Sequence, residues 1–182
     1  MADRLRADWD FDDLDGTEQR FRQLLATETN EGRRAEILTQ LARVQGLRGD
    51  FAEGEQLLEE AEQVAPTDGG AARVRIDLER GRLRRSGGDR EAALPLFESA
   101  FQAAAEAGEA FLAADAAHMA ALVASDRAGF VAWTERGVEL AESREDVRYW
   151  LGPLLNNLGW ELYDASEYGA ALEAFERALE AR

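Results

Sequence analysis

The chain has 182 residues, a formal net charge of −16 at pH 7, 46% hydrophobic residues and no cysteine. Without cysteine, disulfide bonds, thiolate catalysis and zinc sites built on sulfur are excluded. The negative charge repels phosphate backbones, so binding to nucleic acid is disfavoured. All 21 basic residues are arginine, which we interpret as a composition bias of a bacterial kind rather than as a chemical requirement.

Composition also indicates the fold class and the compartment. Alanine, leucine, glutamate and arginine dominate and there are three prolines, which favours an all-α fold. No segment reaches the roughly 18 consecutive apolar residues of a membrane span. The first residues lack the apolar centre of a signal peptide. We therefore expect a cytoplasmic protein that does not bind a membrane.

Residues 1–15 predict an acidic and aromatic strap that docks in an extended form. Five aspartates between Asp8 and Asp15 alternate with Trp9, Phe11 and Leu14, and this composition forms helix poorly. A plainer alternative is that these three apolar side chains pack locally over the first helix as a hydrophobic staple.

A first helix is expected from about residue 17 to residue 28. Asp15 is the predicted N-cap, and Glu18 three residues later would complete a capping box. Phe21, Leu24 and Leu25 share one face of this helix. Its expected role is to cover the open end of the helices that follow.

Similar pairs of helices recur from residue 35 onward. The two helices of each pair are divided by a turn at Gly49, Gly88, Ser125 or Ser166, and an acidic residue follows each of these. Successive turns lie about 40 residues apart, a period within the range of helical repeat proteins. The four predicted units cover residues 35–68, 71–108, 109–142 and 146–182.

The last unit carries the clearest alternation of small and large residues. Its first helix contains Leu158 and Gly159, Tyr168 follows the turn, and the second helix contains Ala171, Phe175 and Ala178. This spacing resembles the tetratricopeptide repeat (TPR) family, in its longer-repeat variety. The resemblance implies a right-handed α-solenoid of antiparallel helix pairs, with residues 16–182 as one superhelical domain. Small residues such as Gly159 would let the paired helices approach closely.

The second and third units depart from this pattern. Pro95 lies early in the second helix of its unit, where a kink or a late helix start is expected. In the third unit His118 stands where the other units have alanine or glycine. Phe130 and Thr134 exchange the expected small and large positions, which can conserve the core volume.

No constellation of residues predicts catalysis, a metal site or a cofactor. His118, the only histidine, lies among alanines, and we interpret it as an interior or groove side chain. The segment from Ser86 to Asp89 indicates a turn rather than a phosphate-binding loop. Carboxylates mix with arginines at helical spacing, as Glu173 and Arg177 do, which supports helices. We therefore expect a protein that is not an enzyme.

A binding groove is predicted on the concave side that the resemblance implies. The segment from Arg73 to Arg90 holds seven arginines against three acids. In a TPR fold the first helix of each unit lines the concave side, which assigns to the groove Arg43, Leu47, Arg75, Leu78, Arg82, Arg85, Asp115, Met119, Leu122, Asn156, Asn157, Trp160 and Tyr163. Their guanidinium, amide and aromatic groups suit an acidic peptide with a large apolar anchor. Alternatively, the arginines only balance neighbouring acids, and Trp160 and Tyr163 are ordinary packing residues.

The favoured hypothesis is a non-enzymatic scaffold whose groove binds an extended acidic or aromatic segment of a partner protein. The alternative is self-assembly into a homo-oligomer. This could use the last helix, whose side bearing Ala170, Ala174 and Ala178 would have no covering helix, or an exchanged N-terminal strap. The strap itself has the composition of the expected ligand, so it also fits the groove of its own chain or of a neighbouring one.

Overall fold

The computed structural model describes residues 3–67 and 70–181, and this part of the chain contains helices and no strands. The expectation of an all-α fold is confirmed. The α-helices are α1 (Leu14–Thr27), α2 (Glu31–Arg48), α3 (Phe51–Val64), α4 (Gly70–Ser86), α5 (Arg90–Ala107), α6 (Ala110–Val123), α7 (Arg127–Ser143), α8 (Leu151–Asp164) and α9 (Tyr168–Glu180). Two 3-10 helices, η1 (Arg6–Asp8) and η2 (Glu145–Trp150), precede α1 and α8.

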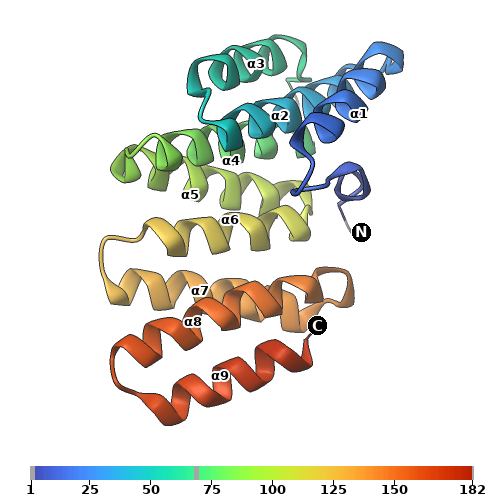
Figure 1. Ribbon diagram of the computed structural model, residues 1–182. Helices are drawn as coiled ribbons and strands as arrows, with labels where there is room; N and C mark the ends of the chain where they lie inside the picture. The colour runs from blue at the N-terminus through green and yellow to red at the C-terminus, as the bar shows by residue number, and fades with distance from the viewer. Residues whose placement is uncertain (1–2, 68–69, 182) are drawn as a thin grey trace.

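The helices stack one after another from the N-terminal end of the chain to the C-terminal end (Figure 1). Four hairpins, α2/α3, α4/α5, α6/α7 and α8/α9, form most of the stack. Polar contacts also connect the first helices of the hairpins: Arg43 to Glu79 between α2 and α4, Arg82 to Asp115 between α4 and α6, and His118 to Asn157 between α6 and α8. We call the surface formed by α2, α4, α6 and α8 the inner face.

The turns inside the hairpins fall where the sequence predicts them. Gly49 and Gly88 adopt positive φ angles of 83° and 91°, which glycine tolerates better than other residues. The aspartates that follow, Asp50 and Asp89, cap the next helix by accepting hydrogen bonds from the backbone N–H groups of Glu53 and Ala92. Each glycine–aspartate pair therefore ends one helix and begins the next.

Close contact between paired helices depends on a glycine that faces a phenylalanine. A Cβ atom added to Gly81 would lie 2.5 Å from a ring carbon of Phe97, and one added to Gly159 would lie 2.5 Å from Phe175. The expected role of Gly159 is therefore confirmed. In the third pair the glycine lies on the second helix and approaches the next pair: a Cβ atom added to Gly137 of α7 would lie 2.8 Å from Leu154 of α8, but 3.5 Å from Ala117 of α6.

Two details of the sequence prediction are wrong, and one of the two alternatives at Pro95 does not occur. Helix α1 begins at Leu14 with Asp13 as its N-cap, rather than with Asp15, because the Asp13 carboxylate accepts from the backbone N–H of Gly16 at 2.9 Å. Glu18 does not close a capping box, since its carboxylate pairs with Arg22 and Arg48. Helix α5 begins at Arg90, before the exposed Pro95, so the late start expected there does not occur.

In the described part of the chain, no helix combines the length and the apolar character that crossing a membrane demands.

We predict that Gly81→Ala destabilises the protein by about 1–3 kcal/mol, because the new methyl group displaces the buried Phe97 ring. Gly169→Ala is the control, since no neighbouring atom lies within 4 Å of the added carbon. That change in helix α9 should be neutral or stabilise by up to about 1 kcal/mol. Urea unfolding measures both variants, and equal effects at the two positions would contradict the close approach.

Candidate interaction face

The centre of the inner face is a buried network of charged side chains. The Arg82 guanidinium donates to Glu79 on its own helix and to Asp115 on α6, at 2.5 Å in each case. Arg43 of α2 lies 3.9 Å from the same Glu79 carboxylate. The Glu79 side chain is 2% exposed. The network therefore ties three helices together through charges that water hardly reaches.

Mutual neutralisation keeps Arg82 and Asp115 ionised. Burial alone would lower the pKa of Arg82, but the carboxylates of Asp115 and Glu79 outweigh it and raise that pKa. Burial would likewise raise the pKa of Asp115, but Arg82 and Arg43 bring it below its ordinary value. Arg82 is thus held by ion pairs, and it also lines the open cavity described below, so its predicted contact with a ligand stays a prediction.

Most other arginines of the segment from Arg73 to Arg90 are also paired. Their partners come from neighbouring helices or from the strap: Arg73 with Glu62 and Asp77, Arg75 with Asp3 and Glu36, Arg80 with Glu55 and Glu62, and Arg84 with Glu55. Arg90 donates to the backbone carbonyl of Leu122. Arg85 is exposed, and no ion pair or hydrogen bond to another described residue holds its guanidinium. The segment therefore presents one unpaired guanidinium rather than a cationic stripe.

The N-terminal strap, residues 3–13, lies on one half of the inner face. Asp3 forms an ion pair with Arg75 of α4, which is also held by Glu36 at 3.1 Å. Leu5 is 2% exposed and packs with Phe21, Ile37 and Leu41. The indole N–H of Trp9 donates to Oε1 of Gln40 on α2 at 2.9 Å. The strap is therefore docked through an ion pair, an apolar anchor and an indole hydrogen bond. It is not extended throughout, as the sequence predicts, because Arg6–Asp8 form the 3-10 helix η1.

Cation–π contacts extend the strap across the face. The Arg6 guanidinium lies 3.5 Å from the centre of the Tyr149 ring in η2. Arg43 lies 5.1 Å from the ring centre of Trp9 and 5.5 Å from that of Phe11. The hypothesis of local packing is also correct in part, because the edge of Trp9 contacts Phe21 of α1. The strap thus spans from α2 and α4 to the start of α8.

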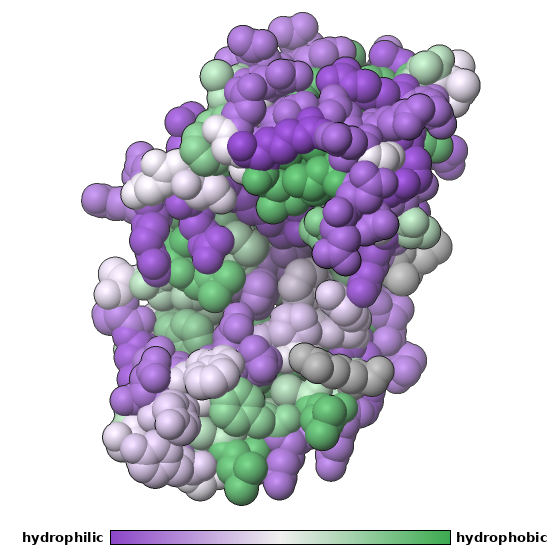
Figure 2. All heavy atoms as spheres, viewed as in Figure 1, coloured by the Kyte–Doolittle hydropathy of each residue, from purple (hydrophilic) through white to green (hydrophobic). Residues whose placement is uncertain are grey.

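The other half of the inner face is open. A cavity of about 200 Å³ there is lined by Arg43, Leu47, Arg85 and Met119, among others. Further along, Trp160 and Tyr163 of α8 are 55% and 51% exposed. Figure 2 shows green, hydrophobic spheres at mid-height on the left of the view. Pale spheres, of intermediate hydropathy, gather at the lower left near the α8–α9 turn. We call the region of Leu47, Arg85, Met119, Trp160 and Tyr163 the open half, and the region under the strap the covered half.

The aromatic end of the open half is a chain of rings in edge-on contact. Trp160 meets Tyr163 at 5.9 Å and Phe175 at 5.4 Å between ring centres, and Tyr163 meets Tyr168 at 5.4 Å. The contacts fix the orientation of the rings while leaving the outer surfaces of Trp160, Tyr163 and Tyr168 accessible. The result is a partly exposed aromatic platform.

The remaining sequence candidates have different surroundings. Asn157 bonds to His118, and Asn156 lines a shallow pocket with Arg6 and Tyr149. Leu122 is half-buried against the core. Leu78 is 1% exposed inside the core, so its assignment to the groove is wrong, because α4 is covered by α2, α5 and α6 together.

The sequence analysis missed Gln40 and Tyr149, which contact the strap. Gln40 carries a usable signal, because a glutamine between leucines at helical spacing is a polar group that needs a buried partner. Tyr149 carries no such signal, since the sequence does not indicate that it lies opposite Arg6.

His118 is a neutral side chain at the junction of α6 and α8. Its Nε2 lies 3.0 Å from Nδ2 of Asn157, and its ring stacks obliquely on Trp150 at 5.4 Å. Burial lowers its pKa to about 4, assisted by Arg82 and Arg85 and opposed by Asp115. The interpretation as an interior side chain agrees with this position.

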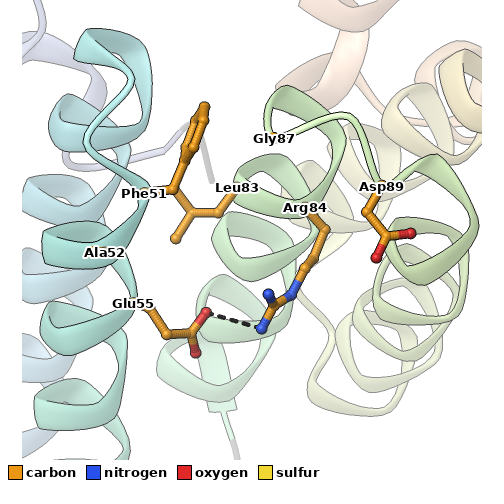
Figure 3. Close-up of a pocket in the computed structure, with 7 residues that line it drawn as sticks. All are labelled: Phe51, Ala52, Glu55, Leu83, Arg84, Gly87 and Asp89. Atoms are coloured by element: carbon orange, nitrogen blue, oxygen red, sulfur yellow. Dashed lines mark hydrogen bonds and ion pairs between the residues drawn. The ribbon is translucent and has the colours of Figure 1, made fainter.

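A separate pocket lies between α3 and α4 (Figure 3). It is lined by Phe51, Glu55, Leu83 and Arg84, among others. Arg84 reaches across it to Glu55 at 3.4 Å. Arg84, which precedes Arg85 in the sequence, is paired with Glu55 in this pocket. The paired Arg84 can therefore be compared with the unpaired Arg85.

No known protein-family model matches the chain, and no curated protein is significantly similar to it. Among solved structures, the chain is similar to BtubC (BKLC) from P. vanneervenii, with a TM-score of 0.70 and 20% sequence identity. The match covers 99% of this chain and 74% of that one. At this level of identity the similarity concerns the fold.

We predict that stability falls as the pH is lowered from 7 to 5, by about 2 kcal/mol from His118 alone. The unfolded histidine takes up its proton near pH 6.5, whereas the folded one does so near 4. The unfolded state therefore binds more protons throughout this range. His118→Gln retains an acceptor for Asn157 but cannot titrate, so its unfolding free energy should depend less on pH. An unchanged slope in urea unfolding at pH 5, 6 and 7 would refute this assignment.

Proposed function

We infer that this protein is a non-enzymatic scaffold that binds an extended, acidic and aromatic segment of a partner protein on its inner face. We also infer that the stack is a right-handed α-solenoid of TPR-like pairs capped by α1, which makes the inner face concave. The expected setting is the cytoplasm, with protein partners rather than nucleic acid or membranes.

The observation that best supports this function is the docked strap. An acidic and aromatic segment of the chain already lies on the inner face, and its contacts combine three modes of peptide recognition. These are a carboxylate on Arg75, an indole on Gln40 and a guanidinium over Tyr149. The face therefore suits the ligand chemistry that the sequence predicts.

The open half is where a partner finds unoccupied groups. Arg85 offers a forked donor for a carboxylate. Leu47 is 52% exposed and provides an apolar surface, and Met119, which is 6% exposed, lines the cavity beside it. Trp160 and Tyr163 add the large aromatic area that commonly dominates binding energy. An acidic residue followed by apolar or aromatic side chains matches this order along the face.

Self-assembly is a second candidate. The side of α9 that was expected to be open is covered instead, because Ala174 and Ala178 are each 4% exposed. A different side of α9 favours association. Leu172 and Leu179 are 59% and 70% exposed on that helix, and Tyr168 at its start is 60% exposed. Residues 172 and 179 are seven apart and therefore lie on the same side of the helix. A second copy that packs on this side would bury them.

We predict that peptides selected from a random displayed library on the wild-type protein are enriched in acidic and aromatic residues. Arg85→Ala and Trp160→Ala should each weaken their binding about tenfold, which is the loss of one charge-assisted or aromatic contact. Arg84→Ala is the matched control, because this neighbouring arginine pairs with Glu55 in the pocket between α3 and α4. Fluorescence anisotropy measures the affinities. Equal binding by the Arg85 and Arg84 variants would remove the open half as the site.

For self-assembly, we predict a dimer in sedimentation velocity at tens of micromolar that Leu179→Glu converts to a monomer. Leu24→Glu is the control, because this leucine is exposed on α1 at the other end of the stack. A wild-type protein that sediments as a monomer throughout this concentration range would rule out association through α9.

A further inference from the structure

We propose that the strap is a displaceable internal ligand. The covered half then accepts an outside segment with the strap's own pattern. In that pattern an aspartate is followed two residues later by leucine, three residues later by arginine and six residues later by tryptophan, as in residues 3–9. The proposal rests on the proposed function, because it names the ligand class and the regulation of the same inner face.

The strap contacts the inner face through three residues that are three positions apart in the sequence, Asp3, Arg6 and Trp9. Backbone hydrogen bonds run from Arg6 to Asp3, from Asp8 to Leu5 and from Trp9 to Arg6, which is the i to i+3 pattern of a 3-10 turn. The 3-10 helix itself covers Arg6–Asp8, and Asp3 precedes it while Trp9 follows it as an extended C-cap. The three contacting residues of the strap meet Arg75, Tyr149 and Gln40, respectively. The pattern is therefore a compact recognition element within a seven-residue segment.

The receiving groups are held in place by the helices themselves. Arg75 is 5% exposed and is positioned by Glu36 as well as by Asp3. Gln40 is 1% exposed, and its Nε2 donates to Oγ1 of Thr39, which aims its Oε1 at the indole of Trp9. A buried carbonyl oxygen without a donor is unfavourable. The covered half therefore selects a segment that supplies a donor at this point.

The strap can leave without unfolding α1. Its base is tied to that helix by two hydrogen bonds between Asp10 and Thr17, and Arg20 donates to the backbone carbonyl of Asp8. The contacts to the rest of the inner face are made by residues 3–9 and by Phe11 over Arg43. Release therefore breaks the side-chain contacts on the face and the packing of Leu5 and Trp9 on Phe21 of α1, while the two hydrogen bonds between Asp10 and Thr17 remain.

The covered and open halves meet at Arg43, which contacts Trp9 and Phe11 and also lines the open cavity. Phe11 is 60% exposed and stacks on Trp9 at 4.9 Å. A partner segment that extends past the open half meets these two rings and must replace the strap to continue. Only chains whose strap is released can bind the whole partner segment. The apparent affinity for that segment is therefore the intrinsic affinity multiplied by the released fraction.

The test uses a fluorescently labelled peptide of residues 3–13, DRLRADWDFDD, as the probe. It is titrated against the full wild-type chain and against the full chain carrying Asp3→Ala and Trp9→Ala. We expect at least tenfold tighter binding to the double variant, because its own strap competes less. A peptide of the same composition in scrambled order is the control. Equal binding to both proteins, or equal binding of the scrambled peptide, would overturn the proposal.

Two further measurements keep the test decisive. Circular dichroism and urea unfolding establish that the double variant is folded; if it is not, Arg6→Ala replaces it, since this exposed side chain contributes only the contact with Tyr149. The weakened chain with Gln40→Leu added should lose most of its affinity for the probe. Retained affinity would overturn the covered half as the site, as would a probe that binds no folded variant.

Failure of this proposal is distinguishable from failure of the proposed function. Library peptides that depend on Arg85 and Trp160 would support the open half even if the strap peptide never binds. Conversely, binding of the strap peptide to the weakened chain should be insensitive to Trp160→Ala. A strap exchanged between two copies would instead give a wild-type dimer that Trp9→Ala dissociates, and this result would overturn an outside segment as the occupant.

Discussion

The inner face depends on one buried interaction, the pairing of Arg82 with Glu79 and Asp115. Arg43 of α2 also reaches Glu79, so three helices meet at this network. Each charge is stabilised only because its partner is in place. Such a network adds little net stability compared with apolar packing, but a rearrangement that separates the charges is costly. It therefore fixes how α2, α4 and α6 lie relative to one another. The positions of Arg75, Arg85 and Met119 on the same helices follow from that alignment.

The inner face has two regions that differ in how their arginines are paired. Acidic partners from the strap and from α2 neutralise Arg75. Arg85, near the C-terminal end of the same helix, has no partner among the described residues. The strong negative charge of the chain makes a free guanidinium conspicuous, because nearly every other arginine of its helix is committed to an acid. Under the proposed function, selectivity for an acidic segment would therefore rest on very few cationic groups.

The sequence was sufficient where the determinants are local. Helical composition, the glycine and aspartate of each early turn, and the glycine facing Phe175 are all encoded within a few residues or one helix pair. It was insufficient where distant segments meet. The partner of Arg75 lies at position 3, and the partner of Arg82 lies on α6, so counting charges within one segment overstated the free positive charge. The N-cap of α1 was misplaced because several aspartates compete for the role and Glu18 is drawn to Arg48.

The unequal covering of the helices also has a consequence for local opening of the structure. Helix α4 is covered by neighbours on several sides, whereas α9 packs mainly on α8 and leaves Leu172 and Leu179 in solvent. In stacked helices, each unit draws its cohesion from the units beside it. Backbone amides of α9 therefore belong to the least protected part of the stack, and those of α4 to the most protected. The aromatic platform of Trp160 and Phe175 sits on the loosely held end, where small rearrangements around an incoming side chain cost least.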